Sequence, residues 1–196
     1  MQPNPILLVH GIDDSGSRFA RLSSFLTENG LGPVLAMDIH PPDASIPMEA
    51  MAGQVASAVQ TLLQTHSARQ VDIAAYSMGT LAVRYYIQRL GGKTRVRRFV
   101  SLAGPHHGTL AAYLRENAGC RQMRPGSAFL ADLNRDEDPW GRVEVFSFWT
   151  PLDLMIFPAG TSRLTGAKNR RFFVLAHPLM VSDPQVMQAA ALALSK

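Results

Sequence analysis

The stretch "VDIAAYSMGT", residues 71–80, places a lone serine between a run of apolar residues and a sequence typical of a helix. Ala75 and Gly79, two positions either side of Ser77, are both small. In a sharp strand-to-helix turn these neighbours approach one another, so only small side chains fit and the serine backbone is strained. The stretch therefore predicts a nucleophile raised above the sheet, although a serine that merely caps the helix stays an alternative.

Outward from this turn, apolar strands alternate with helices along the chain. The expected strands are residues 5–10, 33–39, 70–77, 97–104, 142–149 and 170–176. The expected helices are 18–29, a long one capped by Ser45 that ends near residue 66, 78–90, and 184–194 capped by Ser182. Apolar strands separated by helices indicate a parallel sheet covered on both faces. We expect a doubly wound α/β domain of six strands over residues 1–196.

Composition agrees with one folded domain and excludes several classes of function. Of 196 residues, 46% are hydrophobic and 17% are charged, and no linker or repeat interrupts the chain. The net charge of +4 is scattered, without interleaved aromatics, so we expect no nucleic-acid partner. Cys120 is the only cysteine, which excludes an intrachain disulfide, and we expect a free thiol at the surface or half-buried. The N-terminus lacks signal-peptide features, which favours the cytoplasm unless a leader was removed.

In this fold ligands bind where the carboxyl ends of the strands meet the loops. Three motifs in such loops resemble those of the α/β-hydrolase superfamily, and in particular small bacterial lipases and esterases with alanine at the first pentapeptide position. They are "LLVHGI" (7–12), "DIAAYSMG" (72–79) and "SLAGPHHGT" (101–109). The resemblance implies a minimal α/β-hydrolase fold without a metal or organic cofactor.

A serine hydroxyl needs a base to take its proton and a carboxylate to orient that base. In this fold the chain order is serine, acid, histidine. The fifth strand leads to Asp153 and the sixth to His177, so order and placement select Ser77, Asp153 and His177, the positions that the resemblance also assigns. The backbone N–H of Met78, at the helix N-terminus, is one expected oxyanion donor, and the resemblance makes that of Ile12 the other.

The remaining loop residues give weaker expectations. His10 and the pair His106–His107 are expected to fix loops by hydrogen bonds, with a place in the wall of the acyl or alcohol pocket as the alternative for the pair. Asp13 and Asp14 are expected to point away from the oxyanion or to cap the next helix. Apolar residues near these loops are candidates to line a substrate pocket, although such residues more often belong to the core. These candidates are Ile12, Phe19, Met78, Leu110, Leu154 and Ile156.

Residues 110–138 form an insert after the fourth strand. Two helical stretches within it carry apolar residues on one face, namely Tyr113 and Leu114, then Phe129, Leu130 and Leu133. Two alternatives stay open: a small cap over Ser77, or two surface helices beside the sheet. The sequence predicts a monomeric carboxylic ester hydrolase, with transient lipid-surface contact left open. An acyltransferase, a thioesterase and a binding protein that has lost the chemistry are the rivals.

Overall fold

The structure is a computed structural model, and it describes residues 3–195. Its centre is a parallel sheet of six strands in the order β2-β1-β3-β4-β5-β6. The strands are β1 Ile6–Val9, β2 Val34–Met37, β3 Val71–Tyr76, β4 Val96–Leu102, β5 Glu144–Trp149 and β6 Lys168–Arg171. The predicted doubly wound α/β class and the predicted strand count are confirmed.

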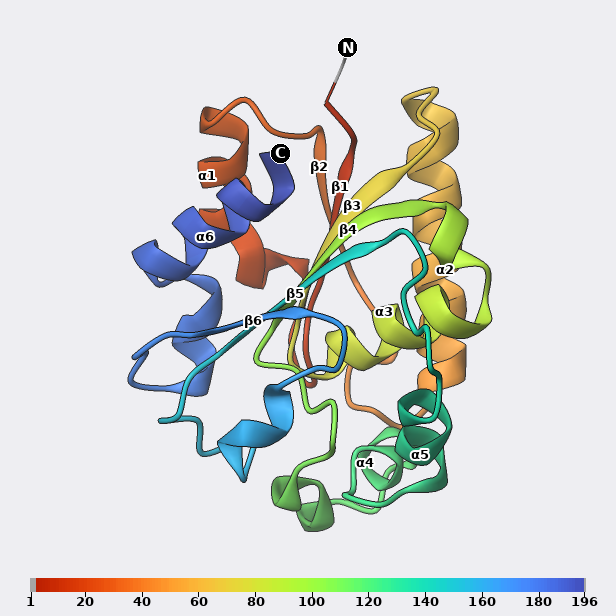
Figure 1. Cartoon of the computed structure of the whole chain (residues 1–196), viewed down its shortest axis with the longest axis vertical. Coiled ribbons are helices and arrows are strands. Elements are labelled where there is room, and N and C mark those ends of the chain that lie inside the picture. The colour runs from red at the N-terminus through yellow and green to blue at the C-terminus, as the bar shows by residue number, and fades with distance from the viewer. Residues whose placement is uncertain (1–2, 196) are drawn as a thin grey trace.

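Helices cover both faces of this sheet, as Figure 1 shows. The α-helices are α1 Ala20–Glu28, α2 Met48–Thr65, α3 Met78–Arg89, α4 Ala118–Gln122, α5 Ala128–Asn134 and α6 Pro184–Ser195. The 3₁₀ helices are η1 Gly16–Phe19, η2 Gly92–Thr94, η3 Leu110–Leu114, η4 Ala159–Ser162 and η5 His177–Val181. Helices α2 and α3 lie against one face, and α1 and α6 lie against the other.

Periodic apolar residues explain this packing. Helix α2 buries seven side chains at spacings of three or four residues: Met48, Met51, Ala52, Val55, Val59, Leu62 and Leu63. That spacing gives a helix one apolar face, which packs on the sheet. The central strands β1 and β3 are buried along their whole length, as continuous apolar runs predict.

Two predicted helix caps are wrong. Pro47 occupies the N-cap position of α2, two residues beyond the expected Ser45, whose N–H instead binds Asp43. At α6, the Asp183 carboxylate accepts the N–H groups of Gln185 and Val186, the role predicted for Ser182. A carboxylate one residue nearer the helix reaches the free N–H groups of its first turn.

The sixth strand is also shifted from its prediction. Strand β6 covers the polar residues 168–171, and the apolar residues 172–176 follow it outside the sheet. Phe172 and Val174 are buried, whereas Phe173 and Leu175 are 72% and 79% exposed. Because the side chains alternate between the core and the surface, the apolar run belongs to an edge segment and not to a buried strand.

Candidate active site

Ser77 occupies the turn between β3 and α3. Its φ of 52° and ψ of −126° are strained for a residue with a side chain, as the sequence predicts. A Cβ at Gly79 would lie 2.8 Å from the Val9 carbonyl oxygen and closer still to that of His10. Glycine at position 79 therefore allows α3 to start against the end of β1, which raises the serine above the sheet.

The structure brings the three predicted side chains together. The Nδ1–H of His177 donates to Asp153 Oδ2 over 2.6 Å, and Ser77 Oγ lies 2.9 Å from His177 Nε2. Because a carboxylate only accepts, it holds the proton on Nδ1 and leaves Nε2 free to accept the serine proton. All three side chains are buried. The arrangement can therefore deprotonate Ser77.

Loop contacts position the acid and the base. Asp153 Oδ1 accepts the N–H groups of Met155 and Ile156 at 2.9 and 2.8 Å, which fixes the carboxylate. Thr150 Oγ1 donates to the Val174 carbonyl over 2.7 Å, which ties the loop after β5 to the segment that leads to His177. The ring of Tyr76 packs against His177 at a centroid distance of 4.8 Å, and burial raises the pKa of this tyrosine.

The two predicted oxyanion donors flank Ser77. Met78 is the first residue of α3, and the N–H groups of a helix's first turn have no acceptor within the helix. The N–H of Ile12 donates no hydrogen bond to any of residues 3–195. The loop that carries Ile12 passes close by, since a Cβ at Gly11 would lie 3.0 Å from Ser77 Cβ. Both N–H groups are thus available to an oxygen beside the serine.

An apolar cavity of about 340 Å³ opens beside Ser77. The predicted Ile12 and Ile156 line it, but four other predicted lining residues do not. Phe19 and Met78 are buried in the two cores, and Leu110 and Leu154 point to solvent. The missed lining residues come largely from the insert: Asp13, Thr109, Ala111, Ala112, Leu114, Arg115, Cys120, Met123 and Met155.

Residues 110–124 of the insert therefore form a wall of this cavity. The sequence alone leaves open whether the insert covers Ser77 or lies beside the sheet. Cys120 is buried in that wall, deeper than the surface or half-buried thiol that the sequence predicts, and burial raises its thiol pKa. Residues 110–114 form a 3₁₀ helix, so Ala112 faces inward while Tyr113 and Leu114 are exposed. The three-residue turn of that helix explains why an α-helical pattern misassigned its buried face.

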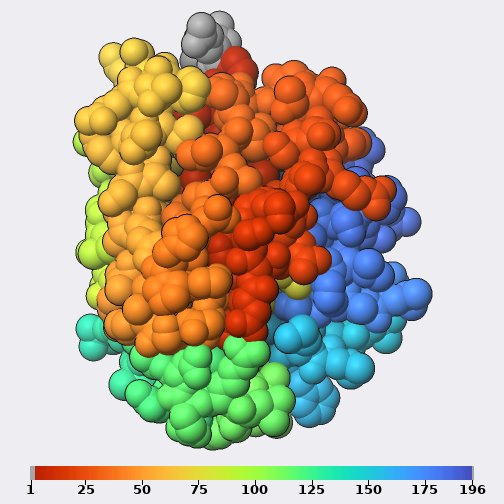
Figure 2. All heavy atoms as spheres, turned by 180° about the vertical axis from the view of Figure 1, so that it is seen from behind, coloured from red at the N-terminus to blue at the C-terminus, as the bar shows by residue number. Residues whose placement is uncertain are grey.

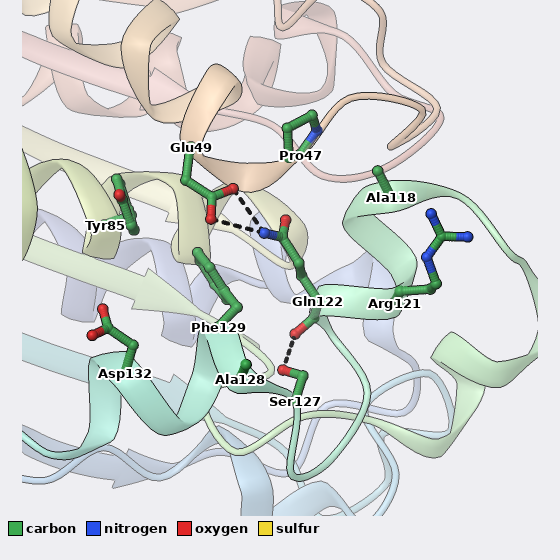
Figure 3. A pocket seen from close by; sticks show the side chains of 10 residues that line it. All are labelled: Pro47, Glu49, Tyr85, Ala118, Arg121, Gln122, Ser127, Ala128, Phe129 and Asp132. Atoms are coloured by element: carbon green, nitrogen blue, oxygen red, sulfur yellow. Dashed lines mark hydrogen bonds between the residues drawn. The ribbon is translucent and has the colours of Figure 1, made fainter.

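A second and larger hollow, of about 590 Å³, lies between α2 and the helices α4 and α5 (Figure 3). Ser77 is not among its lining residues. Here the Gln122 amide donates to both carboxylate oxygens of Glu49, and its oxygen accepts the N–H of Met48 over 2.6 Å. Ser127 Oγ donates to the Gln122 carbonyl over 2.6 Å. These contacts fasten the insert to α2.

Two of the loop histidines make ring hydrogen bonds, His10 with the backbone, as predicted, and His106 with a serine side chain. His10 Nε2 accepts the N–H of Ile39 over 2.8 Å, and its Nδ1 donates to the Gly11 carbonyl. His106 is fully buried, with Nε2 2.8 Å from Ser101 Oγ. Burial, and after it the nearby charge of Arg84, holds the pKa of His106 well below its usual value. Neither His106 nor His107 lines the cavity.

Fold and side-chain arrangement together define the chain as an α/β-hydrolase. Residues 5–130 match the model of the palmitoyl protein thioesterase family. Because this match covers more than half of its 196 residues, the chain belongs to that family.

Known structures share its fold at low sequence identity. Bacillus licheniformis lipase BlEst2 in mature form has a TM-score of 0.86 and 18% identity, over 100% of this chain and 93% of the other. Aspergillus fumigatus lipase B has a TM-score of 0.84 and 15% identity over 99% of this chain, which spans 53% of that protein. Paleococcus ferrophilus monoacylglycerol lipase has a TM-score of 0.66 and 15% identity over 98% of this chain and 95% of the other. No helix within residues 3–195 is long and apolar enough to cross a membrane.

Proposed function

We propose that this chain hydrolyses carboxylic esters, with Ser77 as the nucleophile, His177 as the base and Asp153 as the residue that orients it. The observation that carries the proposal is the hydrogen-bonded chain from Asp153 Oδ2 through His177 to Ser77 Oγ, at 2.6 and 2.9 Å. The surroundings of Ser77 also support the proposal, because two free N–H groups and an apolar cavity adjoin the serine.

The geometry supports a two-step reaction. Ser77 Oγ attacks the ester carbonyl carbon while its proton moves to His177 Nε2. The N–H groups of Ile12 and Met78 stabilise the negative oxygen of the tetrahedral intermediate. That intermediate collapses, the bond from carbon to the leaving oxygen breaks, and His177 protonates the departing alcohol. Water then gives a proton to His177 as it attacks the acyl carbon. The bond from that carbon to Ser77 Oγ breaks, His177 returns the proton to Ser77, and the acid leaves.

The cavity beside Ser77 suits the acyl part of the substrate. Ala112, Cys120, Met123 and Ile156 give it an apolar lining, and burying each methylene group of an acyl chain contributes about 0.8 kcal/mol. A thioester is a second candidate substrate, since the matching family is described as a thioesterase. Its acyl carbon would meet the same serine, and a thiol would leave in place of the alcohol.

The test compares wild type with Ser77→Ala on p-nitrophenyl esters of increasing acyl length and on matched acyl thioesters. We expect Ser77→Ala to lower turnover by about 10⁴-fold or more. Ser24→Ala, at an exposed position on α1, is the matched control and should leave turnover unchanged. The ratio of ester to thioester turnover decides between the two substrate classes.

Three other outcomes would contradict the proposal. Turnover that survives in Ser77→Ala would show that Ser77 is not the nucleophile. A folded wild-type protein that neither cleaves these substrates nor reacts with a fluorophosphonate would favour a binding protein of this fold. Products formed with an added alcohol in preference to water would instead indicate an acyltransferase. The monomeric state stays a prediction, and transient contact with a lipid surface stays an open possibility.

A further inference from the structure

Exposed apolar side chains gather at one edge of the sheet. Of thirteen large ones exposed within residues 3–195, ten come from three short segments. These ten, called the apolar rim below, are Leu110, Tyr113, Leu114, Leu152, Leu154, Met155, Phe157, Phe173, Leu175 and Leu179. The segments follow β4, β5 and β6, so they share the edge where the strands' carboxyl ends lie.

Hydrogen bonds join the three segments into one surface. The N–H of Leu110 donates to the Phe157 carbonyl over 2.8 Å, and Thr109 Oγ1 donates to that of Met155 over 2.6 Å. The bond from Thr150 to Val174 ties the second segment to the third. In Figure 2 the green atoms of the first segment and the light-blue atoms of the second occupy the same end of the molecule.

The cavity beside Ser77 opens within this rim. Leu114 and Met155 belong to both, since they line the cavity while 85% and 47% of their surface stays exposed. An acyl chain held by the rim would therefore meet apolar side chains continuously from the surface to the serine. Scattered exposed leucines need no explanation, but a contiguous group around a catalytic opening indicates a binding surface.

The exposed carboxylates beside the rim are neutralised by arginines, since Asp13 pairs with Arg115 and Glu116 pairs with Arg124. In the three segments (110–114, 152–157 and 173–179) the only carboxylate is that of Asp153, which is buried. Arg170 and Arg171 precede the third segment, with guanidinium carbons 4.7 and 5.0 Å from the centroids of the Phe172 and Phe173 rings. Among residues 3–195 no carboxylate pairs with either arginine.

We propose that the apolar rim binds the surface of an anionic phospholipid membrane, with Arg170 and Arg171 on the lipid headgroups, so that the substrate enters the cavity from the lipid. Apolar burial and attraction of cations to anionic headgroups add in such binding. A second copy of the chain fits less well, because it would bring the same arginines together and close the cavity. The inference rests on the proposed hydrolysis for its purpose, but binding is measurable without turnover.

The test is cosedimentation of the whole chain with two kinds of vesicle, phosphatidylcholine alone and phosphatidylcholine mixed with phosphatidylglycerol. We expect binding to the mixed vesicles that added salt weakens. Leu154, Phe173 and Leu175 do not line the cavity. The triple variant Leu154→Ser/Phe173→Ser/Leu175→Ser should bind vesicles at least about tenfold more weakly, since each substitution removes apolar surface that the lipid would bury. Arg170→Gln/Arg171→Gln should selectively weaken binding to the anionic vesicles.

Controls separate this inference from the proposed function. Leu90→Ser/Leu192→Ser removes two exposed leucines outside the rim and should leave binding unchanged. Ser77→Ala should bind vesicles as wild type does, whatever its effect on turnover. The triple variant should keep wild-type turnover of a short soluble ester, which shows that it is folded.

Three results would overturn the inference. They are no binding of the folded wild type to either vesicle, equal binding to both, and a dimer in solution that the triple variant dissociates.

Discussion

The carboxylate of Asp13, beside the candidate oxyanion donor Ile12, lies 2.5 Å from the guanidinium of Arg115. Arg115 follows the 3₁₀ helix η3, so the insert supplies the counter-charge for an acid in the loop after β1. Both side chains line the cavity with Ser77. Without the arginine, a carboxylate in this position would oppose the negative oxygen of the tetrahedral intermediate. Asp14 is directed elsewhere, because it binds Ser15 N–H and Arg18.

Removing the arginine alone should therefore slow the reaction. We expect Arg115→Gln to lower kcat by about threefold to tenfold, equivalent to the ~1 kcal/mol of a partly exposed charge pair. The double variant Asp13→Asn/Arg115→Gln removes both charges and should recover most of the loss. Steady-state kinetics on a short ester measures both. An equal loss in the double variant would show that Arg115 acts by contact with the substrate or by packing.

Gly79 should be intolerant of any side chain. Gly79→Ala adds a Cβ that meets the carbonyl oxygens of Val9 and His10, so the start of α3 must shift. We expect a loss of about 1–3 kcal/mol in the free energy of unfolding, with reduced turnover as Ser77 moves. Gly53→Ala in α2 is the matched control, because nothing lies within 4 Å of its added Cβ. Helix propensity should stabilise that variant by up to about 1 kcal/mol in urea unfolding.

The depth of the cavity should set the preferred acyl length. Cys120→Phe and, independently, Ala112→Leu place extra volume in its wall and should shift the optimum toward shorter p-nitrophenyl esters. The lost contact should be worth about 1–3 kcal/mol per excluded methylene, or roughly tenfold to 200-fold in kcat/KM. Cys120→Ser keeps the volume and should keep the wild-type profile. An unchanged optimum in both enlarged variants would place the acyl chain outside this cavity.

The sequence predicted the sheet and the grouping of Ser77, Asp153 and His177, because both follow from local rules. Buried parallel strands are continuous apolar runs, and the residues after them share one edge of the sheet. The need for glycine at position 79 could be predicted for the same reason, since the turn itself requires a small residue.

The cavity wall could not be predicted in this way. Cys120 and Met123 reach it because Gln122 and Asn117 bind groups on and before α2, more than seventy residues earlier in the chain. No local pattern encodes such contacts. Phe19 and Leu154 are expected from the sequence in the cavity wall, but Phe19 is buried in the core and Leu154 faces solvent. Their places in the sequence do not tell which way each side chain points.

Buried His106 should make the stability of the protein depend on pH. Desolvation, together with the charges of Arg84 and His107, holds the pKa of His106 well below the ordinary value of 6.5. As pH falls through about 6.5, His106 therefore binds a proton in the unfolded chain but not in the folded chain. Its contribution to stability is present above this pH and is lost as pH falls. The loss should approach about 1.4 kcal/mol per pH unit below the unfolded pKa.

His106→Gln removes this titration and should flatten the decline, even if it lowers stability at neutral pH by breaking the contact with Ser101. Urea unfolding of both proteins at about pH 7.5 and about pH 5.5 measures the decline in the free energy of unfolding, which should be larger for wild type than for His106→Gln by about 1.4 kcal/mol. The exposed His40 provides the control, since His40→Gln should leave the wild-type slope. Parallel pH profiles for wild type and His106→Gln would mean that His106 accepts a proton in the folded state, and that a water or a rearranged Ser101 compensates its charge.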